Sequence, residues 1–205
     1  MEAAQFWQLV AAARDRATDP DNADDVARHA TALLATRPPE VIVAAQQTLW
    51  NLMAESFTNP LWAAAYVING GCSDDGFDYF RGWLILQGRD VFERAVADPD
   101  TLADVPVVRA AASEFDSFEG EAALAIAFDA YPAATGRPLP DDAFTIDYPD
   151  LDPAWSFDFD DCAEMARRLP RLAALYPPEA QPVRTPAPSA VPPHPRPIYG
   201  SGWSP

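Results

Sequence analysis

Helix-breaking residues divide this chain into short segments, and few folds can accommodate that division. Proline or glycine recurs at short intervals, and proline cannot continue a helix while glycine readily ends one. Between the breakers, apolar residues follow the three-and-four spacing of amphipathic helices, as Phe6, Leu9, Val10 and Ala13 do in the first segment. The spacing predicts an all-α fold, a compact multi-helix domain of about seven to eight helices.

The expected helix boundaries follow from these breakers and from capping residues. Ser73 is expected to cap the fifth helix and Ser117 the seventh, and Pro170 to kink or split the last. We expect a helical domain over residues 1–135, and an acidic aromatic extension with a C-terminal helix packed on the body over residues 136–176. The expected helices span residues 2–17, 23–36, 40–57, 61–68, 73–87, 89–98, 118–135 and 158–176.

A proline-rich tail follows the last helix. Ten of the residues from 177 to 205 are proline, and such a composition cannot form a packed core, so we expect a disordered, extended tail. The tail carries Arg184 and Arg196 against Glu179, a net charge of +1, so the body is more acidic than the whole chain.

The charge balance limits the partners that the protein can have. The chain has 14 Lys+Arg, all of them arginine, against 31 Asp+Glu, a formal net charge of −17. This field argues against nucleic acid and against anionic membranes, and it suits a basic protein or a metal ion. The alternative is that the acidity only keeps the protein soluble. The chain has two cysteines, and we expect neither a signal peptide nor a membrane span. We therefore expect a cytoplasmic protein.

The fifth predicted helix carries the most concentrated polar chemistry. At 100° per residue Asp74, Asp78 and Arg81 fall in one narrow sector, with aromatic rings on the opposite face. We expect the rings to face the core and this ionic stripe to border water. Asp74 and Asp78 are candidate ligands for a hard cation, and Arg81 is a candidate clamp for an anion. The alternative is structural, with acids favouring the first helical turn and Arg81 neutralising Asp78.

Aromatic residues near this helix allow two further interpretations. Trp62 and Tyr66 lie one turn apart and just before the glycines, either in a packed core or as the wall of a cleft beside Asp74 and Asp75. A pocket lined by Trp62, Tyr66, Tyr79 and Arg81 would bind a small ligand. The candidate ligand or interaction site comprises Trp62, Tyr66, Asn69, Asp74, Asp75, Asp78, Tyr79 and Arg81.

Two stretches resemble a known bacterial family. The segments "FWQLV" and "LWAAAYVINGGCSDDGFDYFRGWLILQGRDVFERAVADPDTLAD" are similar to sequences of the DUF4240 family. The resemblance covers roughly residues 1–135. The resemblance implies no established activity and no catalytic residues.

Three functions remain open on the sequence. We expect a non-enzymatic interaction or regulatory module that binds a basic protein and needs no cofactor, because no zincin pair, phosphate loop, dinucleotide fingerprint or nucleophile elbow is present. The first alternative is a metal-assisted hydrolase that uses Asp74, Asp75 and Asp78 with Arg81. The second alternative is a small-ligand-binding protein without chemistry.

Overall fold

The computed structural model describes residues 1–113, 117–155 and 157–177, and within these ranges it contains helices and no strand. The all-α prediction is confirmed, and eight of the described α-helices have seven or more residues. The elements are α1 (Ala3–Arg14), α2 (Ala23–Leu34), α3 (Pro39–Glu55), α4 (Asn59–Asn69), α5 (Asp74–Leu86), α6 (Arg89–Ala97), η1 (Pro99–Asp104), α7 (Pro106–Ala111), α8 (Glu121–Thr135), η2 (Pro153–Trp155), α9 (Cys162–Arg168) and α10 (Pro170–Leu175).

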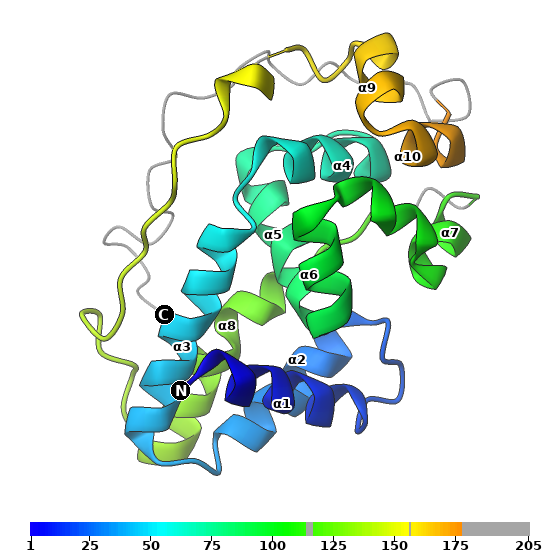
Figure 1. Cartoon of the computed structure of the whole chain (residues 1–205). Helices are drawn as coiled ribbons and strands as arrows, with labels where there is room; N and C mark the ends of the chain where they lie inside the picture. Colours follow the sequence, from blue (N-terminus) through cyan, green and yellow to red (C-terminus); the bar gives the residue numbers. More distant parts are fainter. Residues whose placement is uncertain (114–116, 156, 178–205) are drawn as a thin grey trace.

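Helix α8 packs on three helices that precede it in the chain. It packs against α2, α3 and α5, while α1 pairs with α2, and η1 contacts α4, α6, α7 and α10 (Figure 1). After α8 the chain runs as an irregular segment alongside α3 and then reaches α9 and α10 (Figure 1). We call residues 138–161 of this segment the acidic strap.

Most helix boundaries follow the local rules. Pro39 opens α3, Gly70 ends α4 in the left-handed conformation with φ 67°, and Gly136 ends α8 in the same way with φ 70°. The side chain of Ser73 accepts a hydrogen bond from the Gly76 amide and caps α5 as predicted. The last helix is split at Pro170, also as predicted.

The start of α8 corrects the sequence-based prediction. Ser117 is not its cap, because α8 begins at Glu121 after Gly120. Asn69 holds the backbone of Phe118 instead: its Nδ2 donates to the Phe118 carbonyl at 3.2 Å, and its Oδ1 accepts from the Phe118 amide at 2.9 Å. These two bonds keep the approach to α8 extended. Helix α7 was not predicted at all.

Two glycines allow this approach segment to cross α5 in backbone contact. The Gly120 amide donates to the Tyr79 carbonyl at 2.9 Å. A Cβ added to Gly82 would overlap the Gly120 carbonyl oxygen, and a Cβ added to Gly120 would overlap the backbone of Trp83. Because both obstacles are backbone atoms, neither can move aside as a side chain would.

Helix α5 forms the centre of the core. Phe77, Phe80 and Leu84 are fully buried and Trp83 is 2% exposed, so the inward orientation of the rings is confirmed. Seven aromatic and aliphatic residues of the acidic strap pack against this core from outside: Phe144, Ile146, Tyr148, Leu151, Trp155, Phe157 and Phe159.

The predicted tail lies outside the described residues, apart from Pro177. None of the helices formed by the described residues is both long and apolar enough to cross a bilayer.

Substitution of Gly82 by alanine tests the crossing at α5. The new methyl group would meet the Gly120 carbonyl, so the free energy of unfolding is expected to fall by about 1–3 kcal/mol. Gly76→Ala on the same helix is the matched control, because its nearest neighbour is the Ser73 side chain, and the substitution is expected to be neutral or to stabilise by up to about 1 kcal/mol. Urea unfolding measures both. Equal effects of the two substitutions would contradict the close crossing.

Candidate functional site

The predicted ionic stripe of α5 does not lie in one environment. Asp74 and Asp75 are exposed in the first turn, whereas Asp78 is 7% exposed and Arg81 is fully buried. The expectation that the whole stripe borders water is therefore wrong. A helical wheel places Asp78 and Arg81 on the polar side of α5, but the end of α3 and the acidic strap cover that side.

Buried Arg81 connects three parts of the fold. Its Nε donates to the Phe77 carbonyl at 3.3 Å, its Nη1 donates to the Met53 carbonyl in the last turn of α3, and its Nη2 donates to Asp78 Oδ1. Arginine suits this place because a carbonyl near a helix C-terminus lacks an intrahelical donor. All three nitrogens of the guanidinium thus donate to acceptors of the protein itself.

The guanidinium of Arg81 also lies over three aromatic rings. Its central carbon is 5.0 Å from the ring centroid of Phe57, 4.7 Å from that of Phe77 and 5.3 Å from that of Tyr148. A desolvated cation over aromatic faces is attracted by the ring quadrupoles. Because Tyr148 belongs to the acidic strap, this contact fixes the strap to the core.

Burial shifts the pKa of three groups on and near α5. It raises the pKa of Asp78, and the Arg81 charge offsets part of that rise. Burial likewise raises the pKa of Tyr148, which Arg81 lowers and Asp78 raises further. Asp74 has a raised pKa because of partial burial and the neighbouring charge of Asp75.

The remaining predicted site residues have contacts within the fold. Trp62 is 8% exposed, stacks on Phe77 with centroids 4.8 Å apart, and donates its indole N–H to the Cys72 carbonyl at 3.1 Å. The Tyr66 hydroxyl donates to Asp160 at 2.7 Å, and the Tyr79 hydroxyl lies 3.4 Å from Glu121. Trp62 is thus part of the core, while Tyr66 contacts the acidic strap.

The structure does not bring the eight predicted residues around one cavity. Asn69 and Tyr79 hold the segment before α8, Trp62 and Arg81 lie in the core, and Asp74 is exposed. Among the residues that the structure describes, no group of three or more His, Cys, Asp or Glu side chains is arranged to hold a metal ion. The proposed cation ligands Asp74 and Asp78 remain a prediction.

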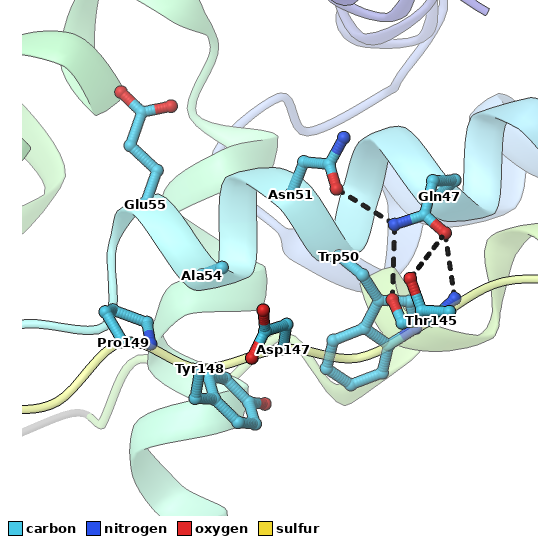
Figure 2. A pocket seen from close by; sticks show the side chains of 9 residues that line it. All are labelled: Gln47, Trp50, Asn51, Ala54, Glu55, Thr145, Asp147, Tyr148 and Pro149. Carbon is cyan, nitrogen blue, oxygen red and sulfur yellow. Dashed lines mark hydrogen bonds between the residues drawn. The ribbon is translucent and has the colours of Figure 1, made fainter.

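A groove lies elsewhere, between α3 and the acidic strap. Its volume is about 590 Å³. Figure 2 shows Gln47 joining its two walls, since the amide accepts from the Thr145 amide at 2.8 Å and donates to the Thr145 carbonyl at 3.2 Å. The lining residues are Gln47, Trp50, Asn51, Ala54, Glu55, Thr145, Asp147, Tyr148 and Pro149. We call this cavity the α3–strap groove.

The α3–strap groove is lined by both aromatic and acidic residues. Trp50 is 3% exposed and packs edge to face with Tyr148 at the floor of the groove, with ring centroids 6.4 Å apart. Glu55 from α3 and Asp147 from the strap supply exposed carboxylates, one on each wall. Two exposed carboxylates at such a groove suit a cationic group.

The acidic strap continues this charge beyond the groove. It contains eight aspartates and no arginine or lysine, and all eight are exposed. In parts of the strap acidic and apolar residues alternate, as in Ile146-Asp147-Tyr148 and Phe157-Asp158-Phe159. The alternation explains the arrangement, because an extended chain sends successive side chains to opposite sides. The aspartates therefore face water while the rings face the body.

Further contacts fasten the strap at its far end. Asn59 donates from Nδ2 to the Asp152 carbonyl at 2.8 Å. Arg168 of α9 places its guanidinium 4.5 Å from the ring centroid of Trp155 and 4.8 Å from that of Phe157. The strap is thus held at the groove, at α4 and at α9.

Sequence reasoning recognised the acidic aromatic stretch but missed the groove. Glu55, Asn51 and Asp147 were not among the predicted site residues. The alternation around Asp147 was the available signal, and the wall formed by α3 had no local signal because the two walls are far apart in the sequence.

The fold and the groove define an all-helical domain crossed by an acidic strap. Residues 1–133 match the family model described as a protein of unknown function (DUF4240), so this chain belongs to the DUF4240 family. No curated protein and no solved structure matches the chain. Helix α3 lies within the matched residues and the acidic strap follows them, so the two walls of the groove fall on either side of the family boundary.

Replacing Arg81 by methionine tests the buried connection. Asp78 would lose its partner, and breaking a buried ion pair costs about 3–5 kcal/mol of unfolding free energy. Asp78→Leu alone is expected to cost a similar amount, because it leaves Arg81 charged and buried. The double variant is expected to lose less than the sum of the two by at least about 1 kcal/mol. Strictly additive losses in urea unfolding would contradict direct coupling of the two groups.

The two cysteines provide a separate test of burial. Burial raises the pKa of the Cys72 thiol to about 12, whereas Cys162 is exposed. Since the thiolate is the reactive form, iodoacetamide at pH 8 is expected to modify Cys162 about ten times faster than Cys72 or more. The rate at Cys72 is expected to rise as the pH rises. Peptide mass spectrometry measures both rates. Equal rates at pH 8 would contradict the raised pKa of the buried Cys72 thiol.

Proposed function

We propose that this protein is a non-enzymatic binding module whose acidic strap recognises a basic protein partner. The observation that supports this most strongly is the exposure of all eight strap aspartates on a segment without one basic residue. Like charges along one segment repel each other, so contacts with the helices are needed to hold the segment in position. The buried connection through Arg81 and Tyr148 is one such anchor.

The form of the strap fits recognition of an extended or helical basic segment. The strap runs alongside α3 and on to α9 (Figure 1), and its aspartates are exposed along that length, so they would meet arginine and lysine side chains spread over a comparable length. Complementary charge of this kind raises the association rate and the specificity for a partner more than it raises the binding affinity. The same field disfavours nucleic acid, whose phosphates need basic partners.

Two variants with the same change in net charge, one in the strap and one outside it, distinguish binding by the strap from binding by the overall negative charge. A fluorescent nona-arginine peptide is the probe, and binding is measured by anisotropy at low and moderate salt. Neutralising four strap aspartates to asparagine is expected to weaken binding about tenfold or more and to reduce its salt dependence. The strap substitutions are at Asp141, Asp142, Asp147 and Asp150.

The control neutralises four exposed aspartates outside the strap. It has the same net charge as the strap variant, so it is expected to weaken binding less than about threefold. Circular dichroism verifies that both variants are folded. Equal weakening by the two variants would show that only net charge matters, and it would refute the strap as the recognition surface. The control substitutions are at Asp15, Asp24, Asp90 and Asp129.

A further inference from the structure

One stretch of the acidic strap has the alternation of a β-strand. The side chains of Phe144, Ile146 and Tyr148 are half-buried against the core, while the residues between them are exposed. Thr145 uses both of its main-chain groups on one partner, since its N–H donates to Gln47 Oε1 and its C=O accepts from Gln47 Nε2. The N–H and C=O of one residue point to the same edge only when the chain is extended. The stretch from 144 to 149 is therefore extended.

The two edges of this extended stretch have different surroundings. Thr145 shows that one edge faces α3, because its partner Gln47 belongs to that helix. Successive residues of an extended chain present their main-chain groups to alternate edges. Phe144, Ile146 and Tyr148 therefore present theirs to the edge away from α3. Figure 1 shows the strap at the outer margin of the described chain, with α3 on its inner side. We call the edge formed by these three residues the open edge.

The main-chain groups of the open edge are unpaired. Among the residues that the structure describes, none is hydrogen bonded to the N–H or C=O of Phe144, Ile146 or Tyr148. A main-chain group without a protein partner must bond to water, so these groups are available to a new partner. A row of such groups is a template to which another extended segment adds as a strand. Pro149 lacks an N–H, but the alternation places it on the α3 edge, so the open edge keeps its donors.

The charge of the strap determines which strand can pair with the open edge. Asp147 is exposed between Ile146 and Tyr148, and the exposed Asp142 and Asp150 lie on either side of the extended stretch. Like charges directly opposite each other on paired strands are destabilising, so two copies of this edge repel each other. A strand that places arginine or lysine opposite Asp147 is attracted instead. The open edge thus disfavours a second copy of this chain and favours a basic strand.

We propose that a basic strand pairs with the open edge in antiparallel orientation. Antiparallel pairs are the more stable per residue, and hydrogen-bonded positions alternate in them with non-hydrogen-bonded positions. Ile146 and Tyr148 take hydrogen-bonded positions, so Asp147 takes the non-hydrogen-bonded position, where opposite side chains lie closest. The partner therefore carries a cation at every second residue. This proposal rests on the proposed function, because it names the form of the basic partner.

Two N-methylated peptides test the pairing without altering the protein. The parent probe is a fluorescent peptide, Arg-Val-Arg-Val-Arg-Val-Arg, and anisotropy measures its binding to the full-length chain. In the proposed pairing the valines direct their N–H groups at the open edge, and the arginines direct theirs away. Methylating two valine nitrogens is expected to weaken binding about tenfold or more, and methylating two arginine nitrogens less than about threefold. The two isomers have the same charge, so equal binding, or weaker binding by the arginine isomer, would overturn the proposal.

Amide exchange in the protein provides a second measurement. Saturating parent peptide is expected to slow exchange at Ile146 and Tyr148 about tenfold or more, because their N–H groups become hydrogen bonded. The Asp147 amide faces α3 and is expected to change less than about twofold. Residue-resolved nuclear magnetic resonance spectra measure all three. Equal protection of the three amides, or of none, would contradict strand pairing. Protection that appears without peptide and increases with protein concentration would assign the open edge to a second copy and overturn the proposal.

The charge variants of the strap separate this proposal from the function on which it rests. The four-aspartate strap variant is expected to weaken binding of the parent peptide more than the matched control variant does. If it does so while the two N-methylated isomers bind equally, strand pairing is refuted and the proposed function is kept. If the isomers differ while the two charge variants weaken binding equally, strand pairing is kept and recognition by the strap aspartates is refuted.

Discussion

The guanidinium of Arg81 is the interaction on which the arrangement of this protein depends. It lies fully buried where α5, the last turn of α3 and the acidic strap meet, and it donates to acceptors on two of these elements while lying over a ring of the third. A buried cation is stable only when it is paired and hydrogen bonded. The strap and the end of α3 must therefore stay in contact with Arg81. The groove between α3 and the strap depends on these contacts.

The proposed binding follows from how the acidic strap is built. Its rings pack on the body and leave the aspartates outside, so one short segment both anchors itself and presents charge. At the groove, Asp147 of the strap and Glu55 of α3 are both exposed carboxylates. Family membership accounts for residues 1–133 only, so the strap is a feature of this chain beyond the family region.

Local patterns predicted the helices well because their causes are local. The cap at Ser73 and the left-handed glycines at 70 and 136 act within one turn, and the apolar spacing of α5 identified its buried face. The prediction for Ser117 was wrong because two hydrogen bonds from distant Asn69 keep the neighbouring residues out of the helix. Arg81 was misplaced for the same reason: Met53 and Tyr148 cover it, and neither is near it in the sequence.

Hydrogen exchange in the acidic strap of an Arg81→Met variant tests the central claim most directly. The variant removes the cation under Tyr148 but leaves every strap residue in place, so any change in the strap comes from the lost connection. Amides from residue 144 to 151 are expected to exchange faster than in the wild type, under conditions where helix α2 stays protected. Unchanged exchange in the strap, with the variant folded, would contradict the account.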